Sequence, residues 1–332
     1  MRLVERDGDC VVEVLLATYN GERFLREQVE SILSQDWPEV LILARDDGSG
    51  DGTAGILAEY ATRFPERFRV LAGESAGGAK GNFLELMRQA NAEYVCFADQ
   101  DDVWLPGKVR LGMEAMRALE ARHGLAMPLL TFSDLRVVGA ELKTVSGSMW
   151  AYAEIEPESA LRLERLVGQS VVTGCTMTIN RRLLELARRM PEEATMHDRW
   201  IALLAAAMGE TAMVREAMVL YRQHGGNVVG AAAPDGSVSG MAARTPDGGR
   251  RAERRRCEAM AEALLRQHGD EMPAGRVALL EAYLRSGQSE SAVERVGITL
   301  REGFFRPGVV KTMALLWDLA RSPSDAGFSE RD

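Results

Sequence analysis

The first third of the chain alternates between short apolar runs and amphipathic stretches, and this alternation limits the possible folds more than any other feature. The apolar runs have the length and composition of buried strands, and they cover residues 11–17, 40–44, 68–73 and 94–98. The intervening stretches repeat apolar residues at helical spacing, and they cover residues 22–35, 54–64 and 82–92. Strands that alternate with helices predict an α/β fold, with a mostly parallel, Rossmann-like sheet flanked by helices.

Polar segments follow three of these predicted strands. They are TYNGE at 18–22, DDGSGDGT at 46–53 and DQDD at 99–102. In an open parallel sheet the carboxyl ends of the strands lie along one edge, and ligands usually bind there. We therefore expect the three segments to meet in a single crevice.

The pattern becomes less regular after residue 128. The further predicted elements are a strand at 129–139, a strand leading into a helix at 170–187, a helix at 195–209 and a strand at 211–227. Small, polar and turn-forming residues then predict a linker, and the remaining pattern is helical. The expected organisation is an α/β domain over 1–230, a flexible linker or loop over 231–249 and a C-terminal helical region over 250–332.

Charge and cysteine content limit the class of protein. The formal net charge of −9 over 332 residues argues against a nucleic-acid partner, which normally requires a basic face. The four cysteines are far apart and show no metal-ligand spacing, which is typical of buried thiols in a reducing compartment. The N-terminus lacks a secretory apolar region, and no apolar stretch approaches the roughly 18 residues of a membrane span. We expect a cytoplasmic protein.

The segment at 99–102 places Asp99, Asp101 and Asp102 within four positions, directly after an apolar strand. Carboxylates this close raise one another's pKa unless a cation lies among them. A solvated acidic turn is the plain alternative, but the flanking residues are apolar. Asp99 and Asp101 would point to the same side of an extended segment, where paired oxygens suit Mg²⁺ or Mn²⁺. We predict a metal ion that bridges to the phosphates of a substrate.

The segment at 46–53 has three interpretations. Its first half matches a calcium-binding loop, but the twelfth position holds Ala58 where such a loop needs a bidentate glutamate. A turn that caps the following helix is the plain alternative. The preferred hypothesis is a loop in which the Asp47 carboxylate accepts a hydrogen bond from the imino group of a nucleobase.

Three motifs in this order, LLATYNGERFLREQVESILSQ, RDDGSGDGT and FADQDDVWLPGKV, resemble the nucleotide-sugar half of the family 2 glycosyltransferases with the GT-A fold. The segment DQDDVWLP, together with VTGCTMTINRRLL, HDRW and YRQHGGNVVG downstream, is most similar to the rhamnosyltransferase-like members. The resemblance covers about residues 10 to 230. It implies that the α/β domain is a GT-A catalytic domain.

The resemblance also implies roles for individual residues. The nucleoside pocket would be lined by Thr18, Tyr19, Asn20 and Glu22, with Asp47 on the base. Asp99 and Asp101 would form the Asp-x-Asp motif that binds the metal and the diphosphate. The remaining donor contacts would be His224, on a closing loop that supplies a metal or phosphate ligand, and Lys80 and Arg222 as diphosphate partners.

The resemblance implies a catalytic base at Asp198. Family members usually carry an acidic pair at the start of a late helix, and the second member is the base. Here the pair is His197–Asp198, so only Asp198 carries the role over. The alternative is that Asp198 is the N-cap of this helix.

The implied reaction is a metal-dependent, inverting glycosyl transfer. A sugar, with L-rhamnose from dTDP-L-rhamnose expected, would pass to a hydroxyl of a glycan or lipid-linked acceptor in cell-surface polysaccharide synthesis. The cofactor would be Mg²⁺ or Mn²⁺. Two alternatives remain: a non-catalytic nucleotide-sugar-binding module, and a metal-dependent nucleotidyltransferase, which would normally show a basic, glycine-rich phosphate loop.

The C-terminal segment GVVKTMALLWDLAR predicts an amphipathic helix with one apolar face. The arginine-rich stretch RRAERRR lies upstream at 250–256. The apolar face could pack on the catalytic domain, form a homodimer, or make a peripheral contact at the inner face of the membrane while the arginines meet anionic head groups.

Overall fold

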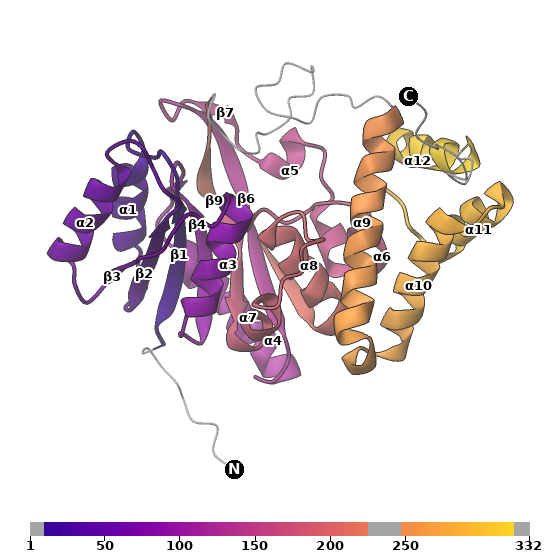
Figure 1. Ribbon diagram of the computed structural model, residues 1–332, viewed down its shortest axis with the longest axis horizontal. Coiled ribbons are helices and arrows are strands. Elements are labelled where there is room, and N and C mark those ends of the chain that lie inside the picture. Colours follow the sequence, from indigo (N-terminus) through magenta and orange to yellow (C-terminus); the bar gives the residue numbers. More distant parts are fainter. Residues whose placement is uncertain (1–9, 225–246, 322–332) are drawn as a thin grey trace, which may run out of the picture.

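The computed structural model describes residues 10–224 and 247–321, which form a curved sheet covered by helices and a helical region beside it (Figure 1). The strands are β1 (Val12–Thr18), β2 (Val40–Asp46), β3 (Phe68–Leu71), β4 (Tyr94–Asp99), β5 (Val103–Trp104), β6 (Leu129–Gly139), β7 (Thr144–Ser146), β8 (Thr178–Asn180) and β9 (Glu210–Gln223). Their spatial order is β3-β2-β1-β4-β8-β6-β9-β5, with β7 paired to β6.

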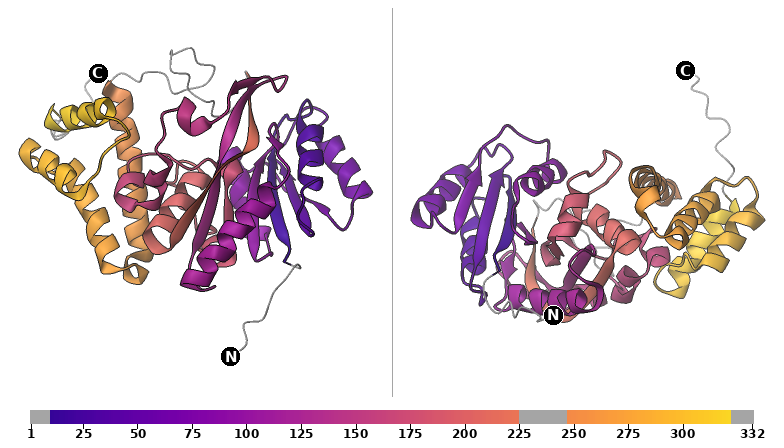
Figure 2. Two further views of the ribbon diagram at one scale, coloured as in Figure 1. Left: turned by 180° about the vertical axis from the view of Figure 1, so that it is seen from behind. Right: turned by 90° about the horizontal axis from the view of Figure 1, so that it is seen from below.

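Helices cover the sheet and extend beyond one end of it. Those of the first part are α1 (Leu25–Leu33), α2 (Thr53–Arg63), α3 (Ala79–Gln89), α4 (Lys108–His123), α5 (Met149–Tyr152), α6 (Leu163–Leu166), α7 (Arg181–Ala187) and α8 (His197–Met208). Those of the C-terminal part are α9 (Asp247–His268), α10 (Ala274–Gln288), α11 (Ala292–Glu302) and α12 (Val309–Arg321). The C-terminal helices lie at the opposite end of the molecule from α1 and α2 (Figure 2).

The four N-terminal strands confirm the predicted α/β arrangement. β3, β2, β1 and β4 pair in parallel, and Thr18 at the end of β1 lies in register with Asp46 at the end of β2. Every side chain of β1 is buried, because helices cover both faces of this part of the sheet. The strand order reverses between β1 and β4, and in open α/β sheets ligands bind beside such a reversal, at the carboxyl ends of the strands.

The second half of the sheet is mixed. β8 pairs antiparallel with both β4 and β6, β9 runs parallel to β6, and β5 runs antiparallel to β9. The strand predicted from residue 170 is shorter than expected, because only Thr178–Asn180 pairs with the sheet. Val171 and Val172 are buried without strand pairing, so their apolar character reflected burial in the core rather than a strand.

The C-terminal helices share an apolar core with the α/β part. One cluster contains Leu15 and Phe97 from the sheet, Trp200 from α8, and Leu264 and Tyr283 from α9 and α10. A second cluster fills the other side of the sheet. The predicted linker at 231–249 falls outside the described residues except at 247–249, where α9 begins. None of the helices in the described ranges has the length and apolarity needed to cross a membrane.

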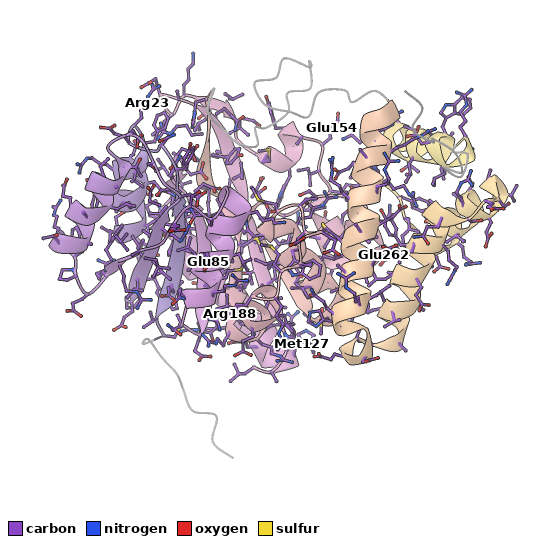
Figure 3. The ribbon with its side chains drawn as sticks, in the orientation of Figure 1. Arg23, Glu85, Met127, Glu154, Arg188 and Glu262 are labelled. Atoms are coloured by element: carbon purple, nitrogen blue, oxygen red, sulfur yellow. The ribbon has the colours of Figure 1, made fainter. Side chains whose placement is uncertain are left out.

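The carboxyl ends of the parallel strands open toward one rim of the molecule. Arg23, in the loop after β1, and Glu154, after α5, both lie on this rim (Figure 3). Arg23 pairs with Glu141 at 2.9 Å, and Glu154 pairs with Lys311 of α12 at 3.0 Å. The second pair connects the C-terminal helix to the rim on which the polar segments lie.

Candidate active site

Hydrogen bonds join the loops that follow β1 and β2. The Thr18 hydroxyl donates to Asp46 Oδ1 at 2.9 Å. The Asn20 backbone N–H donates to Ser49 Oγ at 2.8 Å, and the Asn20 side-chain oxygen accepts from the Gly50 N–H at 2.8 Å. The structure therefore brings two of the three polar segments together, as predicted.

Tyr19 and Glu22 lie in the same pair of loops. Glu22 Oε2 accepts from the Gly52 N–H at 2.9 Å, and the Glu22 N–H donates to Asp51 Oδ2 at 3.1 Å. The Tyr19 residue is 58% exposed, so its ring is open to a ligand, whereas Thr18 is buried. The nucleoside-binding roles of these residues stay predictions.

Gln100 connects the third segment to the first, and sequence reasoning missed it. Its side-chain oxygen accepts from the Tyr19 N–H at 2.7 Å, and its side-chain nitrogen donates to the Tyr19 carbonyl at 2.8 Å. A Cβ atom at Gly21 would lie 2.2 Å from Gln100 Oε1, so glycine is needed for this close approach. The polar residue between the two predicted metal ligands was the only signal for it in the sequence.

Asp47 is buried and forms hydrogen bonds within its own chain. Oδ2 accepts from the Gly78 N–H at 2.7 Å, and Oδ1 accepts from the Ala76 N–H and from Arg45. Burial favours the neutral carboxyl, but the two backbone N–H groups and Arg45 outweigh it and lower the pKa of Asp47. The predicted contact with a nucleobase must therefore share a carboxylate that already holds the loop before α3.

The plain alternative for this loop was a helix cap, but the N-cap of α2 is Gly52 and no side chain caps it; Asp51 instead binds the first residue of the helix. Its Oδ1 accepts from the Thr53 N–H at 3.0 Å, at the start of α2.

Asp99 ends β4, and Asp101 follows in a turn. The turn corrects the prediction of an extended segment, and the two carboxylates are close enough for the charge of Asp101 to act on Asp99. Removal of Asp99 from solvent, with the negative charges of Asp101 and Asp198, raises the pKa of Asp99 to about 7. Three carboxylates from two distant parts of the chain thus share one environment, and their mutual repulsion favours a bound cation.

His224 directly follows β9. It contacts the acidic group, by which we mean Asp99 and Asp101. Its Nε2 lies 2.8 Å from Asp101 Oδ2, and both side chains are mostly buried. The His224 ring packs on the Phe24 ring with the centroids 4.9 Å apart. The structure therefore places two of the three predicted metal ligands in direct contact.

Asp102 lies on the protein side of this group, with a ligand atom within 4.8 Å of one of Asp99. It is fully buried, and its Oδ1 accepts from the Arg222 N–H at 3.1 Å. Burial and the charges of Asp101 and Asp99 raise its pKa, while the ammonium group of the buried Lys108, held 3.7 Å from the centre of the Trp104 ring, lies close enough to interact with it. Lys108 is a second residue that sequence reasoning missed.

Two sets of side chains could hold a metal here. Asp99, Asp102 and Cys175 offer ligand atoms within 4.8 Å of one another. Burial raises the pKa of the Cys175 thiol, and a protonated thiol does not suit a hard cation. Asp99 and Asp101 offer carboxylate oxygens, which suit Mn²⁺ or Mg²⁺ better, and His224 adds an imidazole. The metal-binding role of the predicted set stays a prediction, supported by the carboxylates it contains.

Arg222 and Lys80 are engaged with their own chain. Arg222 is only 2% exposed, and its guanidinium donates to the Asp101 carbonyl at 2.7 Å, to Glu27 and to the Ala140 carbonyl. Lys80 Nζ donates to the carbonyls of Glu192 and Ala194, at 2.8 Å each. These contacts favour positioning roles for both residues, and their predicted diphosphate contacts remain untested.

Asp198 lies in the first turn of α8, and its charge contributes to the raised pKa of Asp99. Its Oδ2 accepts from the Gly174 N–H at 3.1 Å, and its Oδ1 accepts from the Arg199 N–H at 2.6 Å. Because the N-cap residue is Met196, the alternative of an N-cap role for Asp198 is wrong. The carboxylate is instead oriented by two backbone donors and faces the acidic group.

His197, in front of Asp198, is buried between aromatic rings. The centroids of its ring and the Phe83 ring are 3.9 Å apart, and its ring nitrogens have no hydrogen-bond partner within the described chain. Burial lowers the pKa of His197 to about 4. The imidazole is therefore uncharged at neutral pH and packs in the core as an aromatic side chain.

We expect His197 to make the protein less stable in acid. Between its folded pKa of about 4 and the value near 6.5 of an unfolded histidine, the unfolded chain binds more protons, so stability falls as the pH falls. When the pH is lowered from about 7 to about 5, the unfolding free energy of His197→Leu should fall by about 2 kcal/mol less than that of the wild type. Urea unfolding at the two pH values measures this difference. His123→Leu, at an exposed position, should retain the wild-type slope, and an unchanged slope in His197→Leu would contradict the account.

The chain is similar in sequence to known proteins. The family model described as glycosyl transferase family 2 matches residues 13–185, slightly more than half of the chain. A dTDP-rhamnosyl transferase, RfbG of Shigella flexneri, is 26% identical over 228 residues, which are 65% of this chain and 74% of that protein. Three mycobacterial relatives are also 26% identical, and the match spans 59% of their length.

Solved structures show the same fold. S. aureus TarS 1-349 in complex with UDP-GlcNAc has a TM-score of 0.51 at 16% identity, with 94% of this chain and 91% of that chain covered. The mannosyltransferase PcManGT from Pyrobaculum calidifontis, in complex with GDP-Man and Mn²⁺, has a TM-score of 0.52 at 16% identity, with 94% and 81% covered.

Proposed function

This chain belongs to glycosyl transferase family 2, and on that premise we propose that it moves a sugar from a nucleoside diphosphate to an acceptor hydroxyl with inversion at the anomeric carbon. The observation that carries the proposal is the convergence of Asp99, Asp101, His224 and Asp198 at the carboxyl ends of the parallel strands. The first three residues have the chemistry of a metal site, and the fourth is an oriented carboxylate beside it.

Asp198 would act as the general base. Its two oxygens are held by the N–H groups of Gly174 and Arg199, and the start of α8 favours a negative charge. As the acceptor hydroxyl attacks the anomeric carbon, its proton would pass to Asp198 while the bond from that carbon to the diphosphate oxygen breaks. A single displacement of this kind inverts the anomeric configuration.

Asp99, Asp101 and His224 would hold Mg²⁺ or Mn²⁺. When bound, the cation would neutralise charge on the departing diphosphate. Arg222 helps to position this set. Its guanidinium donates to the Asp101 carbonyl and lies 4.5 Å from the centre of the Phe24 ring, and the Phe24 ring packs on His224.

The loops after β1 and β2 would bind the nucleoside. The exposed Tyr19 ring offers a stacking surface, and the Asn20 and Glu22 side chains are fixed by bonds between the two loops. Asp47 would contribute a hydrogen bond to the base. In this arrangement the nucleoside lies next to the acidic group, since Gln100 joins the Tyr19 backbone to the segment that carries Asp99 and Asp101.

We expect dTDP-L-rhamnose to be the preferred donor, and the likeness to RfbG supports this choice. With Mn²⁺ present, dTDP-rhamnose should be consumed faster than UDP-glucose or UDP-galactose under the same conditions, as measured by release of the nucleoside diphosphate. The Asp198→Asn variant serves as the background control. A clear preference for a UDP-sugar would contradict the choice of donor and leave the proposed mechanism standing.

The acceptor would be a glycan or a lipid-linked glycan in cell-surface polysaccharide synthesis, reached from the cytoplasmic side of the membrane. The apolar face of α12 supports a surface contact, because Val309, Val310, Met313 and Trp317 are each more than half exposed. Within residues 10–224 and 247–321, these four side chains are open to solvent rather than packed on the catalytic domain, which was one of the three predicted alternatives. A peripheral membrane contact and a homodimer remain.

Two other functions fit the site less well. A non-catalytic nucleotide-sugar-binding module has no use for a carboxylate oriented beside the metal ligands, as Asp198 is. A nucleotidyltransferase would need a basic phosphate loop after β1, whereas the loop at 18–22 is bonded to the acidic residues of the next loop.

A further inference from the structure

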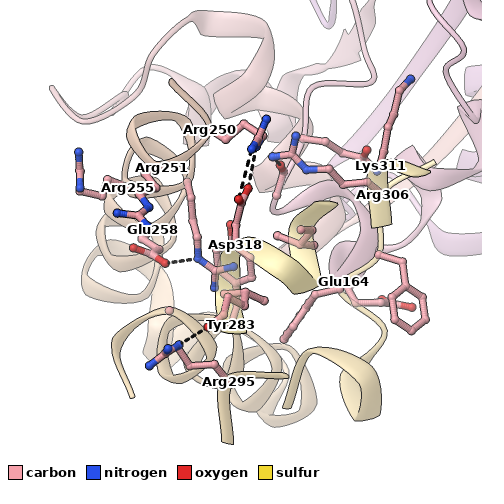
Figure 4. Close-up of a pocket in the computed structure, with 18 of the residues that line it drawn as sticks. Glu164, Arg250, Arg251, Arg255, Glu258, Tyr283, Arg295, Arg306, Lys311 and Asp318 are labelled. Carbon is pink, nitrogen blue, oxygen red and sulfur yellow. Dashed lines mark hydrogen bonds and ion pairs between the residues drawn. The ribbon is translucent and has the colours of Figure 1, made fainter. Parts of the chain in front are cut away.

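A cavity of about 430 Å³ lies among the C-terminal helices, and none of its lining residues belongs to the acidic group (Figure 4). Its walls come from α6, α9, α10, α11 and α12 and from the loop before α12. A volume of about 300–1,000 Å³ is typical of pockets that bind small molecules.

The lining is strongly cationic. Among the described lining residues, eight carry a positive charge: Arg165, Arg250, Arg251, Arg254, Arg255, Arg295, Arg306 and Lys311. Three carboxylates, Glu164, Glu258 and Asp318, accompany them. The protein as a whole has a formal net charge of −9, so this concentration of positive charge is local and opposite in sign to the rest of the molecule. Burying like charges side by side costs free energy unless an anion offsets them.

The three carboxylates are already paired. Glu258 accepts from Arg254 at 2.7 Å, Asp318 accepts from Arg250 at 2.7 Å, and Glu164 pairs with Arg162, outside the cavity, at 2.6 Å. Asp318 lies beside Arg250 in the close-up (Figure 4). Eight cationic and three acidic side chains line the cavity, so positive charge is in excess among the lining residues.

Some of the lining arginines hold the helices together. The Arg295 guanidinium donates to the carbonyls of Leu319 at 2.8 Å and Ser289 at 2.6 Å, and Arg254 also donates to Ser286 Oγ at 2.9 Å. These contacts fix α11 to α12 and α9 to α10. Arg295 and Arg254 are thus part of the walls rather than the best candidates for a ligand contact.

Arg251 and Arg306 form fewer hydrogen bonds with the described part of the chain than Arg254 and Arg295 do. Arg251 Nε is buried and has no hydrogen-bond partner among the residues that the structure describes. A buried guanidinium N–H without a partner is costly and calls for an acceptor. Arg306 donates to the Gly168 carbonyl at 3.3 Å, a long contact that leaves much of its donor fork for a ligand.

We propose that this cavity is a second binding site, which takes a phosphate- or diphosphate-bearing ligand. Several guanidinium groups from different helices match an anion with several oxygens and more than one negative charge, because each fork can donate two parallel hydrogen bonds. Arg251 and Arg306 contact the anion, and Lys311 adds positive charge at the edge.

A free phosphorylated metabolite and a lipid head group share this chemistry. The exposed Val309, Val310, Met313 and Trp317 lie on the same helix as Lys311, so a lipid whose phosphate occupied the cavity would have an apolar surface beside it. The two sources can be separated by presenting the phosphate in solution or on a vesicle.

Calorimetric titration of the full chain with inorganic pyrophosphate, in excess EDTA and at low salt, tests the free form. EDTA removes divalent cations, so binding at the Asp99–Asp101–His224 site does not contribute. The lipid form is tested by co-sedimentation with phosphatidylcholine vesicles that contain phosphatidic acid, against pure phosphatidylcholine. Arg251→Gln combined with Arg306→Gln should lower the affinity for whichever ligand binds by about tenfold or more, since charge-assisted hydrogen bonds are lost.

Arg266→Gln is the matched control, because Arg266 lies on the same helix α9 but pairs with Glu193 outside the cavity. It should bind as the wild type does. If the double variant folds poorly, the single variant Arg251→Lys replaces it. This variant retains the charge and should bind with intermediate affinity. Binding of pyrophosphate or of phosphatidic acid vesicles that the double variant loses supports the proposal and identifies the source. If the wild type binds neither, or if the double variant binds as tightly as Arg266→Gln, the proposal is overturned.

Discussion

Asp198→Asn is expected to lower the turnover number by about 10² to 10⁴ and to leave donor affinity nearly unchanged. The substitution removes the proton acceptor but retains the size of the side chain and its oxygen. Because Asp198 is not the N-cap of α8 and the helix has two full turns of buried residues beyond it, the fold should survive. Steady-state kinetics and titration with the nucleoside diphosphate measure the two quantities separately.

Asp36→Asn is the matched control for this change. Asp36 is an exposed carboxylate that pairs with Arg110 at 2.9 Å, remote from the strand ends, and its substitution should leave turnover within a small factor of the wild type. If Asp198→Asn instead lost donor binding or unfolded at a lower temperature with its turnover preserved, Asp198 would be a structural residue and the base would have to lie elsewhere.

Asp101→Asn is expected to abolish transfer, and a chelator should silence the wild-type protein. Asp101 contacts His224 at 2.8 Å and contributes to the raised pKa of Asp99, so it is the member that joins the proposed metal set. An asparagine in its place offers a neutral amide oxygen, which binds a divalent cation far more weakly than a carboxylate does. Initial rates of nucleoside diphosphate release, with the donor saturating, measure the loss.

Two observations would complete that test. Mn²⁺ added in excess over EDTA should restore the wild-type rate but not the rate of Asp101→Asn. Full activity of the wild type in excess EDTA would exclude a metal-dependent reaction, and the acidic group would then need another explanation, such as neutralisation by Lys108 and His224 alone.

The N-terminal half of the fold was predictable because its elements carry strong local signals. β1 and β4 are continuous apolar runs, and each ends in a polar segment whose residues meet in the structure. A parallel sheet leaves few ways to arrange such elements, so the meeting of the polar segments at one edge of the sheet followed from the order of strands and helices.

Other features depend on contacts between distant parts of the chain. The pKa of Asp99 depends on Asp198, which lies almost a hundred residues later in the sequence, and the contact of Asp101 with His224 depends on the end of β9. Lys108 appears from the sequence to be an ordinary helix residue, yet it is buried beside Asp102. The stretch before β8 was assigned too long a strand because burial in a core and pairing in a sheet give the same apolar pattern.

The C-terminal region shows a similar limit. The arginine-rich stretch at 250–256 was identified from the sequence, but its arrangement was not. Arg250, Arg251, Arg254 and Arg255 face a cavity because α10, α11 and α12 fold back on α9, and Glu253 faces the other way and pairs with Arg199 of α8. One face of a single helix therefore lines the cavity, and another supports the helix that carries Asp198.

The most direct test of the central claim is calorimetric titration with dTDP of the wild type and of Asp101→Asn, each with Mn²⁺ and with EDTA. If Asp99, Asp101 and His224 hold a cation that binds the diphosphate, the wild type should bind dTDP more tightly in Mn²⁺ than in EDTA. Asp101→Asn should lose this gain and bind dTDP under both conditions as the wild type does in EDTA. Equal affinity of the wild type in Mn²⁺ and in EDTA, matched by Asp101→Asn, would contradict the account.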